Sequence, residues 1–206
     1  MLQIELKEAN KILRHKSPDE IINWALTISK RRIVTTSFGV YSAVLLSTFN
    51  KIVKDIDVVW CDTGFNNSET YKHANNLIKR FSLNIHIYSP LVSAAYLQSL
   101  IGIPTLENPK HDDFSELVKL EPFRRALKKH KPVVWFTNIR NRQTEFRNSR
   151  DILSFSKDGI LKVSPYFYWT DDQLDDYLKK HNLPKNVNYF DPTKVLVNRE
   201  CGIHLQ

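Results

Sequence analysis

The chain has 206 residues, of which 42% are apolar and 25% charged, with 30 Lys and Arg against 22 Asp and Glu. This ordinary globular composition excludes a disordered or fibrous chain, and the length favours a single domain. No apolar run reaches the roughly 18 residues that a membrane span needs, and the first eight residues lack a signal-peptide core. We therefore expect a cytoplasmic protein with no membrane partner.

Short apolar strands and amphipathic helices alternate along the chain. Helices are predicted over residues 18–29, 40–52, 68–80, 93–101, 114–130 and 171–181, and strands over residues 32–37, 57–61, 84–88, 132–137, 152–155 and 160–163. This alternation is typical of βαβ units, and it predicts an α/β fold in which a mostly parallel sheet carries helices on both faces. Residues 1–181 are assigned to the α/β domain and residues 182–206 to a C-terminal tail of the same functional unit.

The positive charge is concentrated in one segment. Residues 119–150 contain ten basic and two acidic side chains, so they carry the whole formal charge of +8. Such a field attracts an anionic partner. We interpret Lys128–Lys131 as a solvated helix face, whereas the arginines from Arg140 onward can grip phosphate or sulfate oxygens in pairs. On charge alone, nucleic acid remains an alternative partner.

Ligands of parallel sheets bind beyond the carboxyl ends of the strands. The turn at residues 37–39 follows the first strand, and its amides, with the Ser37 and Ser42 hydroxyls, can cradle an oxyanion. Its single glycine excludes a Walker loop and a dinucleotide fingerprint. After the second strand, Asp62 either caps its own turn or contacts a ligand, and the helix dipole suffices to explain Glu69.

Two cysteines are too few for a disulfide framework or a four-thiolate metal site, and the histidines show no metal-ligand spacing. We therefore predict no metal. Cys61 ends an apolar strand and is predicted to be a core residue. Cys201 lies in a polar tail, where Arg199 and His204 favour its thiolate and Glu200 opposes it.

From about Ser17 to the end, the chain resembles the sulfonucleotide reductases. The most specific match is residues 200–204, Glu-Cys-Gly-Ile-His, which stand in the place of the family's catalytic motif. Weaker matches precede it: the Ser37-Phe38-Gly39 loop, Asp62-Thr63-Gly64 with Glu69-Thr70-Tyr71, Glu121-Pro122 with Arg125-Ala126-Leu127, the motif of Arg140, Gln143, Thr144 and Arg147, and Lys162-Val163 with Pro165. The chain departs from the family pattern at Asn138 and Asn141, where Arg142 can substitute for a missing arginine, and residues 186–197 are shorter than usual.

The resemblance implies an adenine nucleotide α-hydrolase-like (PP-loop) fold and reduction of 3′-phosphoadenylyl sulfate to sulfite and adenosine 3′,5′-bisphosphate in sulfate assimilation. It implies that Cys201 attacks the sulfate sulfur, and that Glu200 and His204 belong to the same catalytic motif. The substrate-binding residues that it implies are Ser37, Phe38, Gly39, Ser42, Asp62, Thr63, Gly64, Glu69, Arg140, Arg142, Gln143, Arg147, Lys162 and Arg199. Thioredoxin or glutaredoxin would supply the electrons, and a homodimer is compatible with the resemblance.

Three alternatives remain open. The family branch that uses adenylyl sulfate typically carries a [4Fe–4S] cluster, which two cysteines cannot ligate, but an adenylyl-sulfate reductase without a cluster is conceivable. A second alternative is an ATP pyrophosphatase-like adenylating or sulfur-transfer enzyme. Such an enzyme requires a Ser-Gly-Gly-x-Asp-Ser loop, and here Phe38, Val40 and Tyr41 replace its decisive residues. A nucleotide- or nucleic-acid-binding module gives no reason for the terminal Glu-Cys-Gly-x-His, so nucleic acid is an unlikely partner.

Overall fold

The structure is a computed structural model that describes residues 4–102, 110–194 and 203. Its helices are α1 (Leu6–Leu13), α2 (Pro18–Leu26), α3 (Ser42–Ile52), α4 (Ser68–Phe81), α5 (Ala94–Ile101), α6 (His111–Ser115), α7 (Glu121–His130), α8 (Glu145–Asn148) and α9 (Asp171–Lys180). Its strands are β1 (Arg32–Thr35), β2 (Asp57–Cys61), β3 (Ile85–Tyr88), β4 (Val134–Phe136), β5 (Leu153–Phe155) and β6 (Leu161–Val163). None of the helices that the structure describes combines the length and apolarity needed to traverse a lipid bilayer.

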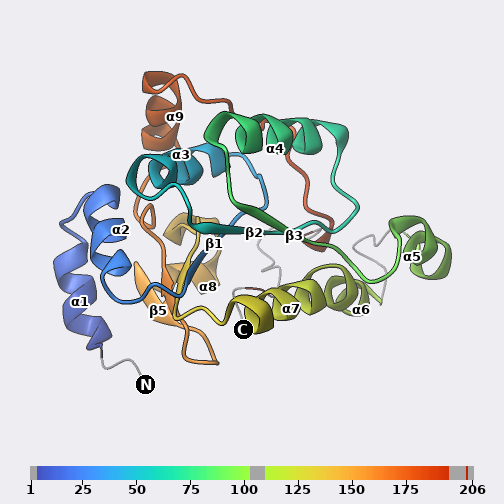
Figure 1. The fold of residues 1–206 in the computed structure, drawn as a ribbon, viewed down its shortest axis with the longest axis horizontal. Helices are drawn as coiled ribbons and strands as arrows, with labels where there is room; N and C mark the ends of the chain where they lie inside the picture. Colours follow the sequence, from blue (N-terminus) through green and yellow to red (C-terminus); the bar gives the residue numbers. More distant parts are fainter. Residues whose placement is uncertain (1–3, 103–109, 195–202, 204–206) are drawn as a thin grey trace.

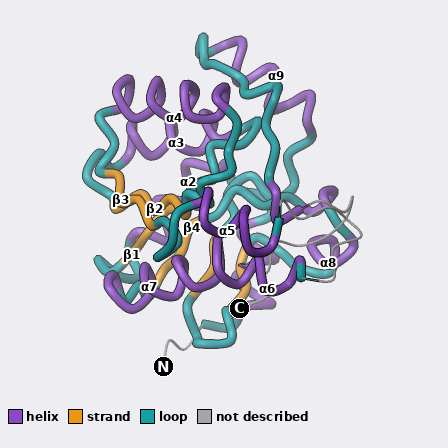
Figure 2. The backbone as a smooth tube through the Cα atoms, turned by 90° about the vertical axis from the view of Figure 1, so that its right-hand side faces the viewer, coloured by secondary structure: helices purple, strands orange, loops and turns teal. Residues whose placement is uncertain are grey.

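The six strands form one sheet in the order β3-β2-β1-β4-β6-β5. All neighbouring pairs run parallel except β5 and β6, which form an antiparallel hairpin around Gly159. Helices α3, α4 and α9 lie on one side of the sheet and α7 lies on the other, as Figures 1 and 2 show from two directions. The predicted α/β fold, with a mostly parallel sheet between helices, is confirmed.

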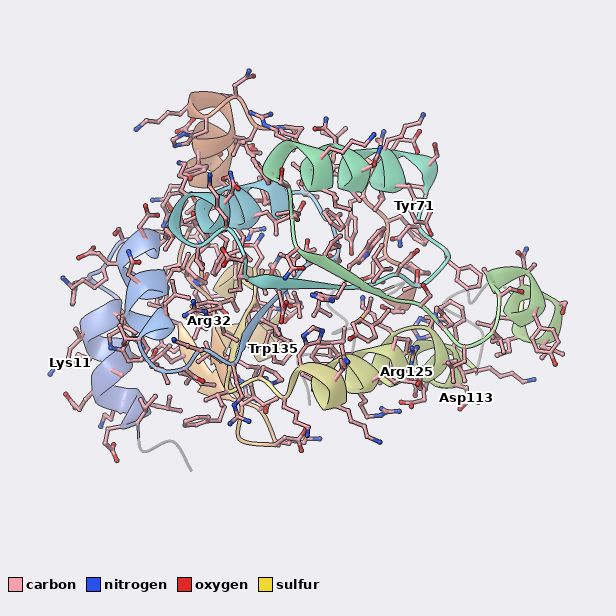
Figure 3. The ribbon with its side chains drawn as sticks, viewed as in Figure 1. Lys11, Arg32, Tyr71, Asp113, Arg125 and Trp135 are labelled. Carbon is pink, nitrogen blue, oxygen red and sulfur yellow. The ribbon has the colours of Figure 1, made fainter. Side chains whose placement is uncertain are left out.

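Strand alternation divides the core between the two faces of the sheet. Val34, Val58 and Phe136 belong to the larger cluster, which includes residues of α2, α3, α4 and α9. Ile33, Val59 and Trp135 point the opposite way, into a second cluster completed by Phe123 and Ala126 of α7 and by Ile203. Figure 3 shows Trp135 in the layer between the sheet and α7, where its ring centre lies 4.9 Å from that of Phe123.

Sequence signals fix several helix ends. Ser17 and Glu20 form a reciprocal capping box at the start of α2, and Thr170 and Gln173 form another at the start of α9. In such a box each side chain accepts a hydrogen bond from the other residue's backbone N–H, so two otherwise unpaired donors are satisfied.

The helix predicted over residues 114–130 differs from the observed one. It begins earlier, at His111, and residues Glu116–Leu120 form a π-helical segment before α7. Pro122 explains the irregularity, because a proline lacks the N–H that an α-helix interior requires and its ring clashes with the preceding turn. After the π-helical segment, Pro122 stands in the first turn of α7, where a missing N–H costs little.

Helix α1 was not predicted, and its position depends on one long-range contact. Asn10 is buried; its Nδ2 donates to the Leu153 carbonyl at 3.0 Å and its Oδ1 accepts from the Leu153 N–H at 2.8 Å. These bonds join the helix to β5, the edge strand, whose backbone groups would otherwise lack a partner there.

Candidate active site

A cavity of about 380 Å³ opens beyond the carboxyl ends of β1, β2 and β4. It lies where the strand order reverses, with β2 on one side of β1 and β4 on the other, which is the usual ligand site of open parallel sheets. Its lining residues with polar or charged groups are Thr35, Thr36, Ser37, Tyr41, Ser42, Cys61, Lys119, Asn138, Arg140, Gln143, Arg147, Asp171, Lys185, Tyr189 and Asp191. The lining also includes Gly39 and Ile203.

The loop after β1 is held from both sides. Phe38 has a left-handed φ of 50°, and its fully buried ring packs edge-on against Trp60 with 4.9 Å between ring centres. Its N–H donates to Thr36 Oγ1, and its carbonyl accepts from Asn186 Nδ2, each at 3.0 Å. Phe38 is therefore the anchor of this loop, and its neighbours Ser37 and Gly39 line the cavity.

The loop ends at a buried Ser–His pair. The Ser42 hydroxyl at the start of α3 lies 3.2 Å from His73 Nε2 of α4. Burial lowers the pKa of His73, which favours the neutral imidazole near pH 7. Ser42 lines the cavity, so this pair fixes a hydroxyl at its wall without adding charge.

The opposite wall is cationic. Gln143 Oε1 accepts from the Arg140 N–H at 3.0 Å and also from the Arg147 guanidinium. Arg140 pairs with Asp171, and its guanidinium lies 4.9 Å from the centre of the Tyr41 ring. Both arginines line the cavity and are more than nine-tenths buried. The low effective dielectric of such a buried site strengthens their attraction to an anion. The predicted residues Arg140, Gln143 and Arg147 are thus brought together with Ser37, Gly39 and Ser42.

The second predicted motif does not line the cavity. Asp62 Oδ1 accepts from the Gly64 N–H at 3.1 Å, from Asn66 Nδ2 at 2.8 Å and from the Tyr71 hydroxyl at 2.9 Å, so Asp62 caps its own turn. Burial and the Asp62 carboxylate raise the pKa of Tyr71 to about 12. Of the other motif residues, Thr63 is buried and Glu69 is exposed. Their role in substrate binding stays a prediction.

Two further predicted residues lie apart from the cavity. Lys162 on β6 is buried, and its Nζ is 5.5 Å from the centre of the Trp135 ring. Trp135 Nε1 in turn donates to Thr35 Oγ1 at 2.8 Å, and Thr35 lines the cavity. Trp135 therefore connects Lys162 to the cavity wall. Arg142 is exposed and does not line it.

Cys61 corrects a sequence interpretation. It was predicted as a core residue, yet it is half-buried and lines the cavity. The reason is its place at the last position of β2, on the same face as Val59, where it packs against the edge of the second apolar cluster and also borders the cavity.

A buried ion pair that the sequence did not single out joins the tail to the domain. Lys119 pairs with Asp191, with only 6% and 5% of their side chains exposed, and Lys119 also donates to Thr193 Oγ1 at 3.1 Å. Farther along, Ile203 is buried against the α7 face of the sheet and lines the cavity. The predicted residues Arg199, Glu200, Cys201 and His204 lie outside the described residues.

The strand order and the cavity at its reversal define an α/β protein with a PP-loop type of fold. Solved relatives of that fold include the FMN adenylyltransferase of Candida glabrata, with a TM-score of 0.61 at 11% identity over 90% of this chain and 62% of that one. At this identity the likeness concerns the fold alone.

The sequence profile of the phosphoadenosine phosphosulfate reductase domain matches residues 31–191. A curated protein named phosphoadenosine 5′-phosphosulfate reductase from Synechococcus is 33% identical over 87% of this chain and 78% of its own length. The crystal structure of phosphoadenylyl-sulfate reductase from Candida auris, a phosphate complex, has a TM-score of 0.77 at 25% identity and covers 90% of both chains. The chain belongs to the phosphoadenosine phosphosulfate reductase family, which makes it an oxidoreductase.

Proposed function

We propose that this chain reduces 3′-phosphoadenylyl sulfate to sulfite and adenosine 3′,5′-bisphosphate. The observation that supports this most is the composition of the cavity, where a hydroxyl- and amide-bearing loop faces Arg140 and Arg147. The loop suits the nucleotide, and the arginine pair suits the phosphosulfate oxygens. Lys119 and Lys185 add positive charge to the same lining, partly offset by Asp171 and Asp191.

The nucleophile of this proposal is Cys201. Ile203 stands two positions later in the chain and lines the cavity, and two residues of chain span at most about 7 Å. This sequence neighbour of a cavity-lining residue supports Cys201 as the nucleophile. Cys61, at the end of β2, also brings a thiol to the cavity lining.

The reaction has two stages. In the first, the Cys201 thiolate attacks the sulfate sulfur, the S–O bond to the phosphate breaks, and adenosine 3′,5′-bisphosphate leaves with that electron pair. In the second, a thiolate of a dithiol protein such as thioredoxin or glutaredoxin attacks Cys201 Sγ, sulfite departs, and a second thiol resolves the mixed disulfide. The dithiol is oxidised to a disulfide, and two electrons pass to sulfur.

The direct test is a turnover assay. The full chain with thioredoxin, thioredoxin reductase, NADPH and 3′-phosphoadenylyl sulfate should release one sulfite for each NADPH oxidised. Pyrophosphate release from ATP without sulfite formation would favour an adenylating enzyme on the same scaffold and would contradict the proposal.

We expect a preference for the 3′-phosphorylated nucleotide over adenylyl sulfate. A further phosphate held by an Arg fork typically adds about 1–3 kcal/mol, which corresponds to roughly a 5- to 150-fold higher kcat/KM. The preference should shrink as salt rises, because screening weakens charge–charge attraction. Steady-state kinetics with both nucleotides at low and high ionic strength measures it, and equal efficiencies would mean that no cationic side chain grips the 3′-phosphate.

The purified protein should contain no iron–sulfur cluster, because two cysteines in one chain cannot supply four thiolates. Iron and acid-labile sulfide assays on anaerobically purified protein check this, together with the visible absorbance. Stoichiometric iron and sulfide would require a cluster shared between subunits and would contradict the prediction.

A further inference from the structure

Three metal-ligating side chains meet at the amino ends of the strands, on the edge of the sheet opposite to the cavity. Asp57 begins β2, His86 lies in β3, and His130 is the last residue of α7. Each offers one ligand atom, and these atoms all lie within 4.8 Å of one another. Asp57 Oδ1 is 2.9 Å from His86 Nε2, and Asp57 Oδ2 is 3.0 Å from His130 Nδ1.

We propose that Asp57, His86 and His130 bind a divalent transition-metal ion of the Zn²⁺ class. Imidazole nitrogen and carboxylate oxygen are ordinary zinc ligands, and three protein ligands leave a fourth position for water. In a tetrahedral site with bonds of about 2.0–2.2 Å, ligand atoms lie roughly 3.3–3.6 Å apart, so small side-chain rotations suffice. Two imidazoles favour zinc, copper or nickel over the magnesium and calcium that all-oxygen sites select.

Groups behind the three ligands already orient them. The Tyr88 hydroxyl lies 3.1 Å from His130 Nε2, the ring nitrogen that does not face the cluster. With a metal on Nδ1, Nε2 keeps its proton and donates to the Tyr88 oxygen. Asn84 Nδ2 donates to Asp57 Oδ1 at 2.8 Å. Such outer hydrogen bonds fix the tautomer and the ring orientation of metal-bound histidines.

The cluster is accessible from solvent on one side and buried on the other. The side chains of Asp57 and His86 are 36% and 37% exposed, whereas that of His130 is 8% exposed. A metal can therefore enter and keep a water ligand. Because the three residues come from β2, β3 and α7, the bound ion would crosslink these two neighbouring strands to the helix. Sequence spacing gave no sign of the site, since 29 and 73 residues separate Asp57 from the two histidines.

The test is titration of the tag-free, EDTA-treated full chain with Co²⁺, followed by competition with Zn²⁺. The wild type should bind one equivalent with the visible spectrum of a tetrahedral nitrogen–oxygen site. His86→Gln and Asp57→Asn should each weaken binding more than about 100-fold, since loss of an outer partner alone costs about 10–100-fold. Tyr88→Phe should weaken it about 10-fold. His15→Gln, at an exposed histidine of the α1–α2 turn, is the matched control and should bind as the wild type does.

Cys201→Ser separates this site from the catalytic tail, because thiolates also bind zinc and cobalt. Unchanged stoichiometry in Cys201→Ser, with binding lost in His86→Gln, supports the proposal. Metal binding lost in Cys201→Ser but retained in His86→Gln would overturn it, as would no binding by the wild type at micromolar metal. His86→Gln changes a half-exposed side chain, so its folding by circular dichroism keeps a loss of binding interpretable.

Discussion

Cys201→Ser is expected to lower sulfite production by at least about 10⁴-fold while leaving nucleotide affinity within a few fold of wild type. A serine hydroxyl is almost entirely protonated at neutral pH, whereas a cysteine thiol ionises far more readily and is the better nucleophile. Adenosine 3′,5′-bisphosphate binding by calorimetry, measured beside turnover, separates lost chemistry from lost binding.

Cys61→Ser is the matched control, because Cys61 is the only other cysteine of the chain and it lines the cavity. It should still release sulfite, since the proposed covalent step uses Cys201 alone. Sulfite production that survives in Cys201→Ser and disappears in a folded Cys61→Ser would transfer the nucleophile to the end of β2.

Lys119→Met is expected to lower the free energy of unfolding by about 3–5 kcal/mol, because it removes the ammonium partner of the buried Asp191 carboxylate. The same contact holds the start of the tail against the π-helical segment, so kcat should fall as well. Urea unfolding followed by circular dichroism measures the first effect.

Two further variants test whether the loss of stability comes from the buried charge. Lys16→Met removes the cation of an exposed pair with Glu20, with side chains 46% and 52% exposed, and should cost less than about 1 kcal/mol. The double variant Lys119→Met/Asp191→Asn should recover much of the lost stability, because Asn keeps an acceptor for Thr193 without the buried charge. A loss in Lys119→Met no larger than in Lys16→Met would show that the buried pair does not fasten the tail.

Much of the fold could be predicted from local sequence patterns. Residues 57–61 were predicted as a strand, and β2 has the same bounds, because an apolar run between polar turns is fully specified by neighbours in sequence. The capping box at Ser17 and the hairpin at Gly159 are equally local. Since parallel strands end at one edge, the turns after β1 and β4 meet there, and Ser37 and Arg140 both line the cavity.

Long-range contacts made by single polar residues could not be predicted from the sequence. Asn186 reaches Phe38 across 148 positions, and Lys119 reaches Asp191 across 72. Neither belongs to a periodic pattern, so propensity and spacing give no signal for it. The Asp-Pro-Thr sequence at 191–193 forms a local turn, in which the Thr193 N–H donates to Asp191 Oδ1 at 3.0 Å, but such a turn carries no information about the distant Lys119.

The most direct test of the account is mass spectrometry of the wild-type chain after incubation with 3′-phosphoadenylyl sulfate in the absence of reductant. We expect one added SO₃ unit per chain, peptide mapping that locates it on Cys201, and its loss with release of sulfite when reduced thioredoxin is added. An unmodified Cys201 under conditions in which the same preparation produces sulfite with thioredoxin, or an adduct on Cys61 instead, would contradict the account.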